Sequence, residues 1–271
     1  MKIKEFPLSL YTSLKFELKS SKSLAKSNSE YLNAVVSLTS IPSRFSILHL
    51  TLKSVLAQKP KPKHIYLWIN ENHKKMIPKK VKALEGDVLK IKFTHLTCSH
   101  KKLIHTLNIE KNRPIITCDD DVLYRKNWLN TLYNSYKKTP NQIIAHRTRC
   151  ISYDSNNNLQ PYKKWICDEG SNSKSIMPIG VEGVLYPPQI FTDLIQNDKL
   201  FLKLAPKSDD LWFKAVELHE NIVARKADQS PKSSIPIAGT QKISLKNFNV
   251  KKDMNYTQWK DLTEYFKLNL T

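Results

Sequence analysis

Three adjacent aspartates, Asp119, Asp120 and Asp121, are the residues of this chain best suited to chemistry. They follow PIITC at 114–118, a short apolar run typical of a buried strand. If the backbone stays extended, Asp119 and Asp121 point to the same side. Two such carboxylates could bind Mg²⁺ or Mn²⁺, which prefer oxygen ligands and often share them with substrate phosphates. The alternative is a solvated acidic turn that binds nothing.

The surroundings of the acidic run favour a bound cation. The apolar residues Val122 and Leu123 follow it directly. Acid is scarce in a chain with 44 Lys and Arg against 24 Asp and Glu. Because three adjacent carboxylates repel one another, a divalent cation would relieve an electrostatic cost.

A second acidic pair lies in the segment KSDDLWFKAVELHEN. Ser208 is the predicted N-cap of a helix that runs to about Asn221, which places Asp209 and Asp210 in its first turn. Acidic residues there stabilise the helix dipole, so a purely structural role is one interpretation. The other is that Asp210 acts as a general base. His219 falls on the opposite helix face and cannot share a metal with Asp210.

Alternating strands and helices are expected to position these residues. Apolar β-rich runs predict strands at 34–40, 64–70, 88–96 and 114–118, and helical spacing predicts helices at 41–58 and 101–110. This order indicates an open, mostly parallel α/β sheet. Ligands bind beyond the carboxyl ends of the strands in such sheets, which is where the three aspartates lie.

The second half of the chain is less regular. A helix is predicted at 128–137, a strand at 142–153 and a loop at 154–175. A strand-like unit, GVEGVLYPP at 180–188, leads to a further helix after Pro188.

The first 33 residues differ from the rest. Phe6, Leu10, Leu14 and Leu18 recur at helical spacing, and a Lys/Ser-rich stretch follows at 19–29. We predict a short helix and a linker that precede one domain at 34–271. The helix could lie on an anionic membrane surface, or it could pack on the domain.

Composition limits the function classes. A chain of 271 residues with 40% hydrophobic content can bury a sizeable core, and its formal charge of +20 favours anionic partners. Most of that charge is Lys, spread along the chain, and no zinc-finger, RNP or basic-zipper pattern occurs. Nucleic acid is therefore not an expected partner.

The cysteines and apolar runs bear on location. Cys98, Cys118, Cys150 and Cys167 form no CxxC pair, which predicts free thiols in a reducing compartment. No run reaches signal-peptide or membrane-spanning length. We expect a cytoplasmic protein, with peripheral contact at the inner face of the cell membrane as an option.

Four segments together resemble glycosyltransferases of the GT-A fold, in particular the bacterial enzymes related to glycosyltransferase family 2. VVSLTSIPSRF with LTLKSVLAQKPKPKHIYLWIN resembles the first strand, helix and second strand of that fold, and IITCDDDVLY resembles its DxD segment. GVEGVLYPP resembles the acceptor-side loop and SDDLW the later acidic motif. The resemblance covers about residues 34–221, and the four motifs occur in the family's order.

The resemblance implies one Rossmann-like nucleotide-sugar domain, with a nucleotide half at about 34–125 and an acceptor half at about 126–271. It implies that Asp119 and Asp121 bind Mn²⁺ or Mg²⁺, and that Asp210, or else Asp209, is the catalytic base. The residues implied to contact the nucleotide sugar are Thr39, Ser40, Arg44, Asn70, Lys102, Asp119 and Asp120. Those implied on the acceptor side are Arg147, Glu182 and Gly183, with Glu182 standing where a small residue is usual.

The expected reaction is transfer of a sugar from a nucleoside diphosphate donor, with UDP as the expected nucleotide, to a hydroxyl of a polysaccharide or glycolipid. Inversion is favoured, and retention stays open. Two alternatives stay open at this point. One is a sugar nucleotidyltransferase, although the first strand is not followed by a Gly-rich phosphate loop. The other is a basic scaffold that binds anionic lipid or polymer without catalysis.

Overall fold

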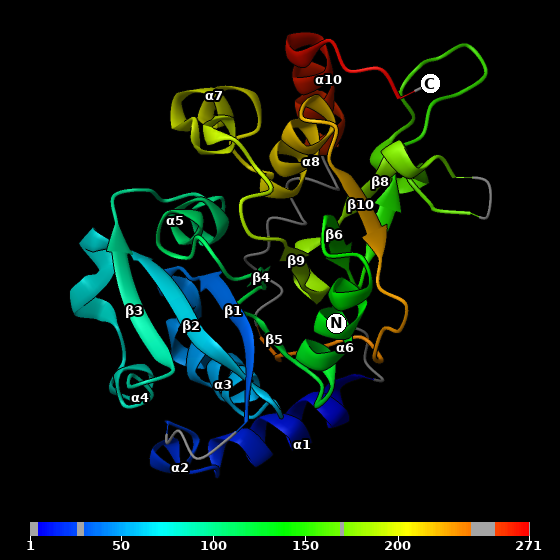
Figure 1. Ribbon diagram of the computed structural model, residues 1–271. Helices are drawn as coiled ribbons and strands as arrows, with labels where there is room; N and C mark the ends of the chain where they lie inside the picture. Colours follow the sequence, from blue (N-terminus) through cyan, green and yellow to red (C-terminus); the bar gives the residue numbers. More distant parts are fainter. Residues whose placement is uncertain (1–4, 26–29, 169–170, 240–252, 271) are drawn as a thin grey trace.

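A twisted seven-stranded sheet forms the centre of the protein (Figure 1). The computed structural model describes residues 5–25, 30–168, 171–239 and 253–270. The strand order is β10-β6-β9-β4-β1-β2-β3. The strands are β1 (Tyr31–Thr39), β2 (Lys61–Asn70), β3 (Leu89–Thr94), β4 (Ile115–Thr117), β6 (Gln142–Ala145), β9 (Val184–Tyr186) and β10 (Val223–Lys226).

All strands of this sheet run parallel except β9, which pairs antiparallel with both β4 and β6. The carboxyl ends of the six parallel strands therefore lie along one edge. The acidic run 119–121 follows β4, which lies in the middle of the order, so the carboxylates are placed near the centre of that edge.

Helices cover both faces of the sheet. Neighbouring residues of β1, Val35 and Val36, belong to two separate buried clusters because successive side chains of a strand point to opposite faces. One cluster includes residues of α3 (Phe45–Leu56), α4 (Lys79–Lys82) and α6 (Trp128–Lys138). The other includes residues of α5 (Lys101–Ile109), α7 (Asp198–Leu204), α8 (Asp209–His219) and α10 (Met254–Phe266). The predicted α/β fold class, with a mixed and mostly parallel sheet between helices, is confirmed.

Two small sheets and several 3₁₀ turns complete the fold. β5 (Val122–Leu123) pairs with β11 (Ile235–Pro236), and β7 (Thr148–Cys150) pairs with β8 (Ile176–Pro178). The 3₁₀ turns are η2 (Pro42–Arg44), η3 (Glu71–Met76), η4 (Tyr162–Lys164), η5 (Ser173–Ser175), η6 (Gly180–Glu182) and η7 (Asp193–Gln196).

The single strand predicted at 142–153 is wrong. β6 belongs to the central sheet and β7 to a separate hairpin-like pair. The chain changes partners at Arg147, whose carbonyl accepts a hydrogen bond from the Ile179 N–H at 2.9 Å. Periodicity cannot reveal this switch because it describes near neighbours along the chain and not the strand with which a segment pairs.

The predicted N-terminal helix is present as α1 (Phe6–Glu17), followed by α2 (Ser21–Ala25). It packs on α3 and β11, but through Ser9 and Phe16, whereas the apolar stripe seen in the sequence faces outward. In that stripe Phe6 and Leu10 are each 49% exposed, Leu14 is 54% exposed and Leu18 is 86% exposed. α1 therefore packs on the domain, as one of the two alternatives expected, and its stripe stays half exposed or more. Within the described residues, no helix has the length and apolar character needed to cross a bilayer.

The expectation of four free thiols is wrong for two of them. Cys150 and Cys167 form a disulfide, and Cys98 and Cys118 are free. The intervening loop turns back through a bridge between Tyr153 and Leu159, and it brings the two Cα atoms within 4.8 Å despite a separation of 17 residues. A spacing rule based on CxxC pairs misses a loop of this size. The argument for a reducing compartment loses its basis.

Candidate active site

Acidic and basic side chains from distant segments meet at the carboxyl edge of the sheet. Asp119 to Asp121 come from the end of β4, and Asp209 and Asp210 come from the first turn of α8. Two basic side chains pair with four of these carboxylates: Arg44 at the start of α3 pairs with Asp120 and Asp121, and Lys102 in the first turn of α5 pairs with Asp119 and Asp209. The fifth carboxylate, Asp210, accepts from the Gly180 N–H.

Asp120 is the anchor of the acidic run. Its side chain is almost fully buried, accepts a hydrogen bond from the Ser40 hydroxyl and forms an ion pair with Arg44. The Thr51 hydroxyl donates to its backbone carbonyl at 2.9 Å. Burial raises the pKa of Asp120, and the Arg44 charge opposes that rise. Ser40 and Arg44, which were expected to contact the nucleotide sugar, therefore contact Asp120 of the acidic run in this structure.

Asp121 and Asp119 face different cations. Arg44 Nη2 lies 3.1 Å from Asp121 Oδ2, and Lys102 Nζ lies 3.1 Å from Asp119 Oδ1. The backbone bends at residues 120 and 121, so the strand-like alternation assumed from the sequence ends before Asp121. Burial, followed by the charges of Asp119 and Asp120, raises the pKa of Asp121 to about 6 against the opposing effect of Arg44.

The donor set suits a cation that relies on substrate for part of its shell. Among the described residues, no group of three or more His, Cys, Asp or Glu side chains could hold a metal ion. Asp119, with a side chain 33% exposed, and Asp121, at 11%, are the reachable oxygens of the acidic run. Mg²⁺ is commonly held by one or two carboxylates together with phosphates and water, and these two residues match that pattern in number and type of donor.

Lys102 is buried at the centre of the cluster. Its Nζ lies 2.9 Å from Asp209 Oδ2 as well as 3.1 Å from Asp119 Oδ1. Burial by itself lowers the pKa of a lysine, but the charges of Asp119, Asp209 and Asp210 raise the pKa of Lys102 well above its usual value. Lys102 is therefore a permanent positive charge that joins the β4 and α8 carboxylates.

The two aspartates of α8 have opposite environments. Asp209 accepts a hydrogen bond from the Ser99 hydroxyl at 2.8 Å and pairs with Lys102, and this pairing lowers its pKa despite burial. Asp210 accepts only from the Gly180 N–H, at 3.2 and 3.3 Å, among its described contacts. Burial and the adjacent charge of Asp209 raise the pKa of Asp210 to about 8, against the effect of Lys102. Paired carboxyls with divergent pKa values are typical of acid–base sites.

The expected acceptor-side residues Arg147 and Glu182 lie at a cavity whose lining contains none of the five clustered aspartates. Arg147 is exposed after β6, and Glu182 Oε2 accepts a hydrogen bond from the Ser234 N–H at 3.0 Å. Both line a cavity of about 280 Å³ together with His146, Lys226, Ser230, Pro231 and Ser233. The resemblance implied a small residue at position 182. The Glu182 carboxylate found there instead contacts the 230–236 segment through its hydrogen bond with Ser234.

Gly183 is required by its backbone and by its neighbour. It has φ of +99°, and a Cβ there would lie 2.7 Å from Trp128 Nε1. We expect Gly183→Ala to lower the free energy of unfolding by about 3 kcal/mol, because backbone strain and overpacking add. Gly239→Ala is the matched control, since Gly239 has φ of +89° and nothing within 4 Å. Thermal unfolding followed by circular dichroism should show the larger loss for Gly183→Ala, and equal losses would contradict the Trp128 contact.

The side chains of Thr39 and Asn70 form hydrogen bonds with nearby backbone groups. The Thr39 hydroxyl donates to the Trp68 carbonyl at 2.8 Å. The Asn70 amide donates to the His95 carbonyl at 2.7 Å and accepts from the Asn72 N–H at 3.0 Å. Both lie at the carboxyl edge, but their described contacts are those of residues that fix strand ends.

Sequence patterns missed several residues of the cluster. Ser99 orients Asp209, Gly180 contacts Asp210, and the Tyr124 hydroxyl accepts a hydrogen bond from the Asp119 N–H at 2.9 Å. Tyr162 is buried near Asp210, whose charge contributes to raising its pKa after burial itself. Of these residues, only Gly180 left a signal in the sequence, as the first glycine of GVEGVLYPP. Ser, Thr and Tyr residues occur in no sequence motif that would have selected them.

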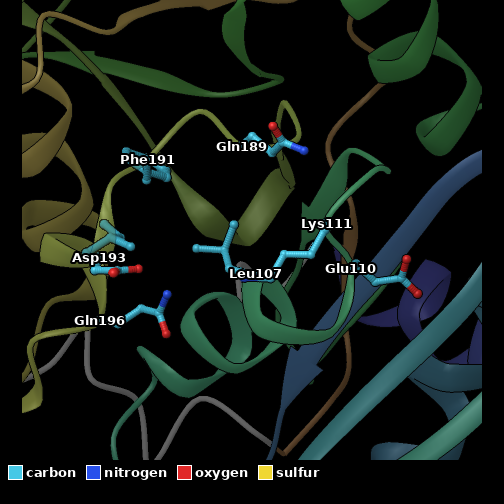
Figure 2. Close-up of a pocket in the computed structure, with 8 residues that line it drawn as sticks. Leu107, Glu110, Lys111, Gln189, Phe191, Asp193 and Gln196 are labelled. Carbon is cyan, nitrogen blue, oxygen red and sulfur yellow. The ribbon is translucent and has the colours of Figure 1, made fainter.

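A second cavity lies at the other end of α5 (Figure 2). It has a volume of about 120 Å³ and is lined by Leu107, Glu110, Lys111, Gln189, Phe191, Asp193, Ile195 and Gln196. Glu110 caps the end of α5, whereas Lys102 lies in its first turn, so this cavity is separate from the acidic cluster. No residue singled out from the sequence lines it.

No family profile matches the chain, and no curated protein sequence matches it. Among solved structures, it is similar to a 4-diphosphocytidyl-2C-methyl-D-erythritol synthase from Anaerococcus prevotii, with 13% identity, a TM-score of 0.49 and coverage of 84% of this chain and 99% of that chain. It is also similar to a mannosyltransferase from Pyrobaculum calidifontis in complex with GDP-mannose and Mn²⁺. That match has 11% identity, a TM-score of 0.48 and coverage of 98% of this chain and 80% of that chain.

Proposed function

We propose that the protein is a metal-dependent glycosyltransferase that moves a sugar from a nucleoside diphosphate donor to a hydroxyl of a glycan or glycolipid. The observation that carries this proposal is the pairing of two carboxylate sets through Lys102. One set, at Asp119 and Asp121, is partly exposed, and the other contains Asp210 with a pKa raised to about 8. A cation-binding pair beside a strong carboxylate base is what glycosyl transfer to a hydroxyl needs.

Asp210 is the proposed general base. Its raised pKa makes it a stronger proton acceptor than an ordinary aspartate, and it removes the proton of the acceptor hydroxyl as that oxygen attacks the anomeric carbon. Gly180 lets the backbone approach Asp210 closely, because a Cβ there would lie 3.1 Å from Asp210 Oδ1 and 3.2 Å from Lys102 Nζ, which is tighter than an ordinary contact. Attack by a base-activated hydroxyl opposite the departing diphosphate favours inversion.

Asp119 and Asp121 are the proposed ligands of Mn²⁺ or Mg²⁺. The ion, when bound, offsets the negative charge that develops on the departing diphosphate. Asp120 holds the run in place through Ser40 and Arg44. Lys102 keeps the positions of Asp119 and Asp209 fixed relative to each other and adds positive charge near the phosphates.

A donor screen tests the proposal. The purified chain is incubated with UDP-, GDP- and CMP-linked sugars, and separately with CTP and sugar phosphates, in Mn²⁺ and in chelator. We expect metal-dependent release of nucleoside diphosphate from one sugar nucleotide, with UDP-sugars the first choice. Release of pyrophosphate from CTP would instead identify a nucleotidyltransferase, and no binding or turnover of any nucleotide would overturn both assignments.

A further inference from the structure

The exposed apolar face of α1 is the largest unexplained surface feature of the described residues. Six of the thirteen large hydrophobic side chains that are exposed belong to this one segment, and none of them takes part in the acidic cluster. They are Phe6, Leu8, Leu10, Tyr11, Leu14 and Leu18. Water-facing hydrophobic residues are ordinary when scattered but indicate an interaction surface when they are contiguous.

Four apolar side chains are grouped on the outward side of α1. At about 100° per residue, Phe6, Leu10, Leu14 and Leu18 fall within an arc of about 120°. Ser9 and Phe16, on the opposite side, are the buried residues of the helix. A helix that needed only to pack on the domain would turn its leucines inward. This orientation therefore leaves the apolar stripe exposed to a partner.

The helix is firmly held in this orientation. Lys53 Nζ donates to the Glu17 carbonyl at 3.0 Å and to the Lys19 carbonyl at 2.7 Å, which satisfies the carbonyls at the C-terminal end of α1. The Glu17 carboxylate pairs with His49 and with Lys80. These contacts anchor the C-terminal end of α1 and leave Phe6, Leu10 and Leu14 exposed.

The positive charge near α1 favours an anionic partner for the apolar stripe. Lys15 is exposed on α1 and Lys22 on α2, and the lysine-rich segment 74–82 adjoins the end of α1 through the pairing of Lys80 with Glu17. That segment also exposes Met76. A second copy of a chain with charge +20 would bring like charges together, whereas an anionic bilayer offers both an apolar layer and opposite charge.

We propose that α1 lies in the plane of an anionic lipid bilayer, with Phe6, Leu10, Tyr11, Leu14 and Leu18 inserted below the headgroups. A helix of 12 residues is about 18 Å long, which suits an interfacial position. Flanking lysines contact the lipid phosphates.

The same helix supports the acidic cluster. The Ser9 hydroxyl donates to the Pro236 carbonyl at 2.7 Å and accepts from the Ala238 N–H at 3.1 Å. Between them, the Ile237 N–H donates to the Asp121 carbonyl at 3.1 Å. A bilayer on the outer side of α1 therefore lies close to the strand pair that holds Asp121. In a step that rests on the proposed function, the acceptor is accordingly a lipid-linked sugar at the bilayer surface.

Vesicle co-sedimentation of the full chain tests the surface. We expect binding to vesicles of phosphatidylcholine with phosphatidylglycerol, little binding to phosphatidylcholine alone, and weaker binding in about 1 M salt, where the Debye length falls to about 3 Å and only the apolar contribution is left. Leu10→Ser/Leu14→Ser should weaken binding by about tenfold or more. Leu202→Ser, on α7 and 44% exposed in the native chain, is the control that should bind normally.

The outcomes separate this surface from the proposed enzyme activity. Donor hydrolysis without lipid should be equal in the native chain and in Leu10→Ser/Leu14→Ser, because neither leucine touches the acidic cluster. If the chain binds vesicles but turns over no donor, the proposed enzyme activity and the lipid-linked acceptor are wrong. The proposed membrane binding of α1 is then still supported. Failure of the native chain to bind anionic vesicles would overturn the proposal. So would light scattering that detects a dimer which the double variant abolishes.

Discussion

Asp210→Asn is expected to lower kcat for sugar transfer by about 10² to 10⁴-fold, the range over which a positioned general base acts. The amide keeps the oxygen that accepts from the Gly180 N–H, so the local geometry is retained. In the native chain kcat/KM should rise with pH through about 8, as Asp210 loses its proton. This limb of the profile should disappear in Asp210→Asn. Initial rates from about pH 6 to about pH 9.5 give the measurement.

The same substitution should make the protein more stable. Because the pKa of Asp210 is raised above its unfolded value of 3.8, the folded state loses stability as pH rises from about 4 to about 8. Asp210→Asn removes the titrating group and with it this loss of stability. At neutral pH we therefore expect the free energy of unfolding to rise by about 1 kcal/mol or more and Tm to rise by a few degrees. Loss of activity together with gain of stability distinguishes a buried base from a residue that maintains the fold.

Asp209→Asn provides the matched comparison one residue away. The pKa of Asp209 is lowered by Lys102, so its stabilising effect is present above its unfolded pKa and is lost as pH falls through its folded pKa. At neutral pH, Asp209→Asn should therefore lower the free energy of unfolding by about 1–3 kcal/mol, because it removes a charged hydrogen-bond partner. Equal stability changes of the same sign in the two variants would contradict the division of roles between the two aspartates.

Asp121→Ala is expected to weaken Mn²⁺-dependent binding of the donor nucleotide by more than about 100-fold, since even outer-shell changes at metal sites cost about 10- to 100-fold. Titration calorimetry with the nucleotide from the donor screen measures this. Arg44 keeps its pairing with Asp120, so the fold should be retained. In the native chain, Mn²⁺ affinity should fall as pH drops below about 6, because protons then compete for the Asp121 carboxylate.

Asp261→Ala controls for loss of one negative charge from the chain. Asp261 is exposed on α10, and its removal should leave metal and nucleotide binding unchanged. Nucleotide binding in chelator should be the same in Asp121→Ala and in the native chain. If Asp121→Ala binds Mn²⁺ and nucleotide as the native chain does, Asp121 is not a metal ligand.

The sequence by itself determined most of the element order and the edge at which chemistry takes place. Period-two and helical patterns located the strands that became β1, β2, β3 and β4 to within a few residues. Ser208 was correctly placed as the residue before α8. These features depend on local propensity and on burial of one face, which neighbouring residues encode.

Only the tertiary structure decided how the charged residues meet. Lys102 joins Asp119, 17 residues away, to Asp209, far along the chain, and no spacing rule relates these positions. The opposite pKa shifts of Asp209 and Asp210 likewise come from burial and from their distances to Lys102, since the two residue types are identical. The Cys150–Cys167 disulfide, the outward turn of the α1 leucines and the exchange of partners between β6 and β7 are of the same kind. Each depends on contacts between segments distant in sequence, whereas periodicity describes only a residue's near neighbours.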